Sequence, residues 1–99
     1  MGDLCGEIEK FGKGIGSVPR YRLLEALFSG PKTVGELAKK TKLSQPLVSQ
    51  HLRVLKESNL VSDERSGQEV RYMLNMEHTV TLLKRLVDEM KSKQTRQQK

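Results

Sequence analysis

Residues 33–55 read TVGELAKKTKLSQPLVSQHLRVL, and this stretch contains two helix-start signals separated by a short turn. Thr33, with Glu36 three residues later, matches a capping box, which predicts a short helix. Ser44 is a favourable N-cap and Pro46 is tolerated in a first helical turn, so a longer helix is predicted to follow. A short helix joined to a strongly capped longer one by about three residues is typical of a helix-turn-helix.

The second of these helices has two contrasting faces. At about 100° per residue, Val48, Leu52 and Leu55 fall on one side and predict a buried stripe. The opposite side carries Pro46, Ser49, Gln50, Arg53 and Glu57. Gln can bond adenine, Arg can bond guanine, and Ser can serve either a base or a phosphate. Such a face on an isolated helix is more typical of a solvated surface. The helix-turn-helix layout, the basic hairpin that follows and the net positive charge together favour a recognition helix that reads the major groove of duplex DNA.

Periodicity, caps and breakers place the remaining elements. We expect helices at about residues 3–13, 18–29, 34–40, 45–58 and 77–93, and two strands at 60–65 and 69–74. The strands form a β-hairpin with Arg65, Gln68 and Arg71 near its tip, and a very short extra strand could form at Lys32-Thr33. The predicted fold class is mainly α with a small β-hairpin, a winged helix-turn-helix in the order α-α-α-α-β-β-α.

Apolar stripes run along the helices outside the helix-turn-helix. The helix capped by Ser17 is expected to bury Leu23, Leu24, Leu27 and Phe28. The first helix carries Leu4, Ile8 and Phe11, and is expected to end where Gly12, Gly14 and Gly16 interrupt it. The last helix carries Val80, Leu83, Val87 and Met90, with Leu82 and Leu86 widening the stripe. The stripes on the first and last helices have no partner assigned within the chain.

Length and composition limit the classes of protein that fit. The 99 residues form one domain, which we expect at 1–93, followed by a disordered basic tail at 94–99. Lys and Arg exceed Asp and Glu by 18 − 12 = 6, and this excess suits a polyanionic partner. A single cysteine excludes an intrachain disulfide, and we find no secretion signal and no apolar stretch that could span a bilayer. We therefore expect a soluble, cytoplasmic protein.

Residues 43–55, LSQPLVSQHLRVL, resemble the recognition helix of the ArsR/SmtB winged-helix repressors. The likeness extends to NLV at 59–61, RYML at 71–74 and RYRLL at 20–24, and it covers roughly residues 15–90. The resemblance implies a homodimeric transcriptional repressor whose first and last helices pair across a two-fold axis and which binds a pseudo-palindromic operator. Its partners are then double-stranded DNA and a second copy of the chain, and the sequence identifies neither a cofactor nor a small-molecule effector.

The same resemblance assigns roles to individual residues. Those expected to enter the major groove are Ser44, Gln45, Pro46, Ser49, Gln50 and Arg53. Those expected to hold phosphates or the minor groove are Thr33, Lys42, Arg65, Gln68 and Arg71. Those expected at the dimer interface are Leu4, Ile8, Phe11, Val80, Leu83, Val87 and Met90.

Metal-sensing sites of related repressors have no complete counterpart in this sequence. The family's Cys-x-Cys site would fall on Thr33-Val34-Gly35, which contains no metal ligand at either end. The zinc-type positions on the last helix read Met76, His78, Glu89 and Ser92, of which only His78 and Glu89 could coordinate. Zinc requires four ligands, or three with water, so no metal site is predicted. Cys5 is either a small apolar residue beside Leu4 or, across a dimer, a thiol that pairs with its copy or lends one metal ligand.

Other classes of function fit the sequence less well. A winged helix that binds another protein should expose an aromatic or aliphatic patch in place of the Ser/Gln/Arg face. A chromosome-associated protein without sequence preference would bind all duplexes equally. An enzyme is not predicted, because no nucleophile, paired carboxylates or nucleotide loop stands out and so short a chain leaves little room for a cleft.

Overall fold

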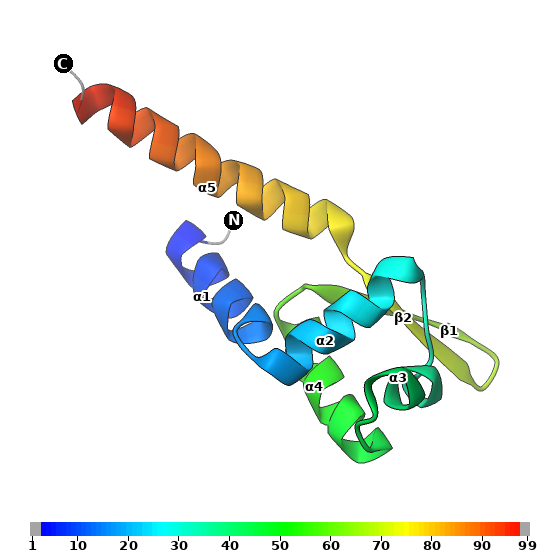
Figure 1. The fold of residues 1–99 in the computed structure, drawn as a ribbon. Coiled ribbons are helices and arrows are strands. Elements are labelled where there is room, and N and C mark those ends of the chain that lie inside the picture. The colour runs from blue at the N-terminus through cyan, green and yellow to red at the C-terminus, as the bar shows by residue number, and fades with distance from the viewer. Residues whose placement is uncertain (1–2, 98–99) are drawn as a thin grey trace.

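The computed structural model describes residues 3–97, with side chains as far as Gln94, and Figure 1 shows its helices and hairpin. The elements are α1 (Leu4–Ile15), α2 (Val18–Ala26), the 3₁₀ turn η1 (Leu27–Ser29), α3 (Val34–Thr41), α4 (Gln45–Glu57), β1 (Val61–Ser66), β2 (Glu69–Leu74) and α5 (Met76–Gln97). This arrangement confirms the predicted winged helix-turn-helix and the order α-α-α-α-β-β-α.

Side-chain caps start the helices where the sequence predicted them. Thr33 and Glu36 form both bonds of the capping box: the Thr33 hydroxyl accepts from the Glu36 amide, and the Glu36 carboxylate accepts from the Thr33 amide. The Ser44 hydroxyl accepts from the Leu47 amide at the start of α4, and Ser17 does the same for Arg20 at the start of α2. These bonds satisfy amide groups that have no partner within the helix.

A single core joins α2, α3, α4 and the start of the hairpin. Its buried members are Leu23, Leu24, Ala26, Leu27, Leu37, Val48, Leu52, Leu55, Leu60 and Val61. The predicted stripe of α4 is confirmed, since Val48, Leu52 and Leu55 are at most 1% exposed. Each fully buried aliphatic side chain contributes about 1.5–3 kcal/mol relative to an exposed one. The core therefore fixes the rotation of α4 about its own axis.

The hairpin is attached to the helix-turn-helix by backbone pairing. β1 and β2 pair antiparallel, from Val61 opposite Leu74 to Ser66 opposite Glu69, and Gly67 takes a positive φ of 65° in the two-residue turn. Lys32, just before α3, exchanges two backbone hydrogen bonds with Tyr72, with N···O distances of 3.0 and 2.7 Å. The short strand expected near Lys32-Thr33 is thus a single β-bridge, which holds the wing beside the start of α3.

Two predictions about the N-terminal half were wrong. Phe28, expected in the core, is 62% exposed, because α2 ends at Ala26 and the tighter 3₁₀ turn that follows changes the direction of its side chain. The first helix does not stop at its glycines but continues to Ile15. The carbonyl groups of Lys13 and Gly14, near its C-terminus, accept hydrogen bonds from Arg20, and this contact between helices offsets the low helix propensity of glycine.

The last helix is longer than expected and lies beside α1, extending well past it (Figure 1). It continues to Gln97, whereas we expected an ordered helix to about residue 93 and a disordered tail from 94, because no Gly or Pro interrupts the sequence between Met76 and Gln97. Residues 98–99 of that tail lie outside the described residues. None of the helices within residues 3–97 combines the length and hydrophobicity that crossing a membrane would require.

Candidate nucleic-acid interface

The exposed face of α4 presents polar groups that are not engaged elsewhere. The side chains of Pro46, Ser49, Gln50, Arg53 and Glu57 are all exposed, as the periodicity of the sequence predicted, and Gln45, which only the family resemblance assigned, is exposed as well. Within the part of the chain that the structure describes, Gln45, Ser49, Gln50 and Arg53 make no side-chain hydrogen bond or ion pair. Their donors and acceptors are therefore available to another molecule, on a helix that the core holds in place.

Lys42, in the turn between α3 and α4, adds a positive charge near the N-terminal end of α4. Lys42 follows α3 in the left-handed conformation, with φ of 64°, and its amide donates to the Ala38 carbonyl. Its side chain is exposed, as is Ser44. Because Ser44 also caps α4, its hydroxyl has a structural role besides any contact with DNA.

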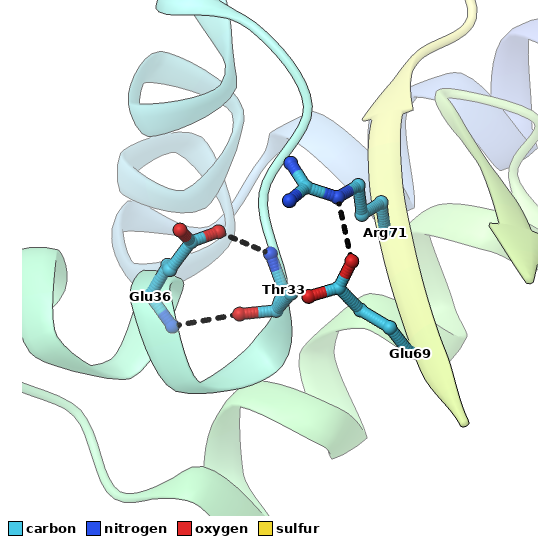
Figure 2. A network of polar contacts seen from close by, with 4 residues as sticks. All are labelled: Thr33, Glu36, Glu69 and Arg71. Atoms are coloured by element: carbon cyan, nitrogen blue, oxygen red, sulfur yellow. Dashed lines mark hydrogen bonds and ion pairs between the residues drawn. The ribbon is translucent and has the colours of Figure 1, made fainter. Parts of the chain in front are cut away.

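Thr33 and Arg71, both expected to hold phosphates, lie on neighbouring elements (Figure 2). Thr33 is half-buried and its hydroxyl is engaged in the capping box, whose backbone hydrogen bond from Thr33 lowers the pKa of Glu36. The Arg71 guanidinium donates to the Glu69 carboxylate at 3.0 Å, and this hydrogen bond raises the pKa of Arg71. This bond uses only the Nε atom of Arg71, so its two Nη groups keep donors that a phosphate could accept.

The wing carries less positive charge than its two arginines suggest. Arg65 and Gln68 are exposed at its tip, as expected. However, residues 61–74 also contain Asp63, Glu64 and Glu69, so that the formal charge of the hairpin is 2 − 3 = −1. Asp63 is paired with Lys56 of α4 at 2.9 Å, which ties the hairpin to the recognition helix. Arg65 makes no ion pair within the described residues.

Two hollows, one beside α4 and one between α2 and the end of α3, involve residues that sequence reasoning missed. One, of about 310 Å³, brings Lys56 and Tyr72 together with Ser49 and Arg53. The other, of about 450 Å³, is lined by residues of α2 and the end of α3, namely Arg22, Glu25, Ala26, Lys40, Thr41 and Lys42. The positive charges were visible in the sequence, but their proximity to the predicted site depends on how the helices pack.

His51 lies on α4 away from the polar face. Its side chain is half-buried, and burial, followed by the nearby charge of Arg20, lowers its pKa. The imidazole is therefore neutral at neutral pH and adds no positive charge to the candidate interface.

The residues predicted for the dimer interface divide between half-buried and exposed positions. Leu4, Ile8 and Phe11 of α1 are half-buried, and Phe11 packs against the core. On α5, the exposed fractions are 47% for Val80, 38% for Leu83, 46% for Val87 and 59% for Met90. Leu82, which we placed in the same stripe, is instead 3% exposed. It lies one turn after His78, which contacts Glu7 of α1, so one side of α5 packs on α1 and the other is left uncovered.

An apolar groove continues the uncovered side of α5. Its volume is about 190 Å³, and it is lined by Phe11, Ile15, Tyr21, Leu24, Phe28, Leu60, Leu74, Met76, Thr79 and Leu83. Tyr21, Phe28 and Met76 are exposed and were not predicted to belong to this surface. An exposed aromatic at Phe28 could have been anticipated only from the position of the 3₁₀ turn.

The structure groups few metal-ligating side chains. No cluster of three or more His, Cys, Asp or Glu residues suited to a metal occurs among the described residues. His78 lies in the first turn of α5, with its Nε2 atom 3.7 Å from a carboxylate oxygen of Glu7. Cys5 is exposed on α1.

Comparison with known proteins identifies relatives of this chain. The model of the bacterial regulatory protein family arsR matches residues 18–63. The transcriptional repressor SdpR of Bacillus subtilis is 38% identical over 63 residues, which are 64% of this chain and 70% of SdpR. Two further curated relatives, HTH-type regulators of Mycobacterium tuberculosis, are matched over 52% and 54% of their lengths, so the chain spans about half of each.

Solved structures show the same fold. HlyU from Vibrio cholerae is 30% identical with a TM-score of 0.69, and the match covers 87% of this chain and 97% of HlyU. The winged helix-turn-helix DNA-binding domain of Mb0332 from Mycobacterium bovis, described as homodimeric, is 26% identical with a TM-score of 0.72, covering 88% of this chain and 83% of that domain. The chain therefore belongs to the ArsR family of winged helix-turn-helix proteins, which are DNA-binding transcriptional regulators and not enzymes.

Proposed function

We propose that this chain is a repressor that binds a pseudo-palindromic operator as a homodimer and places α4 in the major groove. The observation that carries the proposal is the exposed face of α4, where Gln45, Ser49 and Arg53 have no partner in the described part of the chain. The opposite face of the helix is buried in the core. A rigid helix with free amide, hydroxyl and guanidinium groups suits the recognition of base edges.

Each predicted contact has a role in this proposal. The residues that read bases are Gln45, Ser49, Gln50 and Arg53, with Ser44 and Pro46 at the entry of α4 into the groove. The residues that hold the DNA backbone or the minor groove are Thr33, Lys42, Arg65, Gln68 and Arg71. Because the Nε atom of Arg71 is paired with Glu69 and Thr33 is engaged in a cap, the most freely available donors of this second group belong to Lys42, Arg65 and Gln68.

A second copy of the chain would cover the apolar side of α5. The stripe of Val80, Leu83, Val87 and Met90 is solvent-exposed in a single chain, and Leu4, Ile8 and Phe11 of α1 complete the proposed interface. The homodimeric description of the Mb0332 domain supports the same assembly here. A two-fold dimer would present its recognition helices about 34–36 Å apart, one turn of DNA.

We include no metal-sensing step in the proposal. At the family's zinc-type positions only His78 and Glu89 could act as ligands, and the predicted operator contacts do not depend on them. A repressor must reach chromosomal DNA, so we place the protein in the cytoplasm. We divide the chain into a DNA-binding and dimerisation domain at 1–93 and a short basic tail.

The proposal is tested by fluorescence anisotropy with duplex DNA from upstream of the protein's own gene and a scrambled duplex of the same composition. Both are titrated at two salt concentrations. We expect tight binding to the upstream duplex only, and a steep loss of affinity as salt rises, because phosphate contacts release counterions. Equal affinity for both duplexes would replace the proposal with a sequence-neutral chromosome-associated protein. Absence of binding to either would favour a winged helix that binds a protein.

A further inference from the structure

The C-terminal end of α1 packs tightly against the C-terminal end of α4. Gly14 is the buried residue of α1. A Cβ atom added to it would lie 2.6 Å from Leu60 Cδ1 and 2.9 Å from Ser58 Oγ. Both neighbours are themselves buried, with exposed fractions of 4% and 6%, so neither can move aside easily. A side chain at this position would require the buried Leu60 or Ser58 side chain to move or one helix to shift relative to the other.

The two neighbours of Gly14 are fixed to the last turn of α4. The Ser58 hydroxyl donates to the Val54 carbonyl at 2.8 Å, and the Ser58 amide donates to the same carbonyl at 2.9 Å. The Leu60 amide donates to the Leu55 carbonyl at 2.9 Å. A displacement of α1 at Gly14 would therefore be passed to the recognition helix.

Arg20 of α2 closes the same junction from the other side. Its guanidinium donates from Nε to the Gly14 carbonyl at 3.0 Å and from Nη2 to the Lys13 carbonyl at 2.7 Å. A charge-assisted pair of bonds at a helix C-terminus is favourable both as hydrogen bonds and through the helix dipole. Lysine could not reproduce this contact, because its single ammonium lacks the fork of two nitrogens.

We propose that Gly14 and Arg20 are positioning residues that fix the angle between the dimerisation helix α1 and the recognition helix α4, and thereby the separation of the two recognition helices in the dimer. The inference rests on the proposed function, since it requires a dimer that reads two half-sites. Neither residue touches DNA in this scheme. They affect how strongly the second recognition helix binds its half-site once the first recognition helix is bound.

The test compares Gly14→Ala with Gly12→Ala, a matched control on the same helix. A Cβ atom at Gly12 would meet nothing within 4 Å. Affinity is measured by anisotropy for the operator and for a duplex in which one half-site is scrambled, and the mass of each variant by sedimentation. Linking two binding events raises the overall affinity by about 100-fold or more. We therefore expect the preference of Gly14→Ala for two half-sites over one to fall by at least about tenfold. Its affinity for the single half-site and its dimer mass should stay at the parental values, as should all properties of Gly12→Ala.

A second variant keeps the test decisive if Gly14→Ala loses affinity for both duplexes through poor folding. Arg20→Gln leaves the Gly14 contact in place and removes the charged fork, so the same selective loss is expected. A series of operators with one base pair added or removed between the half-sites should shift its optimum in both variants. The inference would be overturned if Arg20→Gln, or a folded Gly14→Ala, kept the parental preference for two half-sites and the parental optimum of half-site spacing. A parent protein that shows no preference for two half-sites would instead overturn the proposed function.

Discussion

Helices α4 and α5 are both amphipathic, yet they treat their apolar residues in opposite ways. In α4 the stripe of Val48, Leu52 and Leu55 is buried and the polar face is exposed. In α5 the stripe from Val80 to Met90 is exposed, while Leu82, on a different side of the same helix, is buried. Periodicity alone does not distinguish an apolar face that the chain covers itself from one that a second chain must cover.

The two helices therefore have different roles, one in the stability of the single chain and the other in its assembly. The stability of the single chain depends on α4, whose stripe lies at the centre of the core. We assign the assembly of two chains to α5, whose uncovered stripe continues into the apolar groove beside α1 and α2. Substitutions in the two stripes should therefore separate folding from dimerisation.

The largest effect is expected in the buried stripe. Leu52→Ala should lower the free energy of unfolding by about 2–5 kcal/mol, because it removes a buried side chain and leaves a cavity. Urea denaturation followed by circular dichroism measures this loss. A destabilisation below about 1 kcal/mol would show that the packing around α4 can collapse and that the helix is less firmly held than its burial indicates.

Substitution in the exposed stripe should break the dimer and leave the fold intact. Leu83→Asp places a charge on the proposed interface, so sedimentation should give the 11.2 kDa mass of one chain in place of twice that value. Affinity for the operator should fall by about 100-fold, because the two half-sites are no longer linked. Circular dichroism should keep the helical signal of the parent. An unchanged sedimentation mass would contradict the role given to α5.

The polar face of α4 should contribute sequence preference. Gln45→Ala or Ser49→Ala is expected to weaken binding to the operator by about 1–3 kcal/mol and to spare binding to scrambled DNA. Glu57→Ala, at the far end of the same helix, serves as a control and should leave the preference unchanged. Anisotropy titrations with both duplexes measure the difference. A uniform loss on both duplexes would argue against reading of bases by these residues.

The smallest effect is expected in the wing, where Arg71 is already paired. Arg71→Gln should weaken binding equally for all sequences and reduce the slope of log affinity against log salt by about 1. Glu69→Gln should strengthen binding, since it frees the Nε atom of Arg71 and removes an anion beside this proposed phosphate contact. Titrations over a range of salt concentrations measure both. A change of sequence preference in Arg71→Gln would mean that the wing reads bases.

Much of this architecture could be predicted from local sequence signals. The capping box at Thr33, the N-cap at Ser44 and the buried stripe of α4 depend on residues within one or two helical turns of each other, and all three are present in the structure. The exposed positions of Ser49, Gln50 and Arg53 followed from the same periodicity. Their part in binding DNA stays a prediction until the titrations above are made.

Only the tertiary structure decided the features that depend on distant segments. Phe28 is exposed because α2 gives way to a 3₁₀ turn, and α1 continues through its glycines because Arg20 binds carbonyl groups at its end. Leu82 is buried and Leu83 is not, because α1 covers one side of α5 only. The sequence by itself determined where helices begin and which faces are apolar, since these follow from neighbouring residues. Which apolar face is covered depends on contacts between segments far apart in the chain.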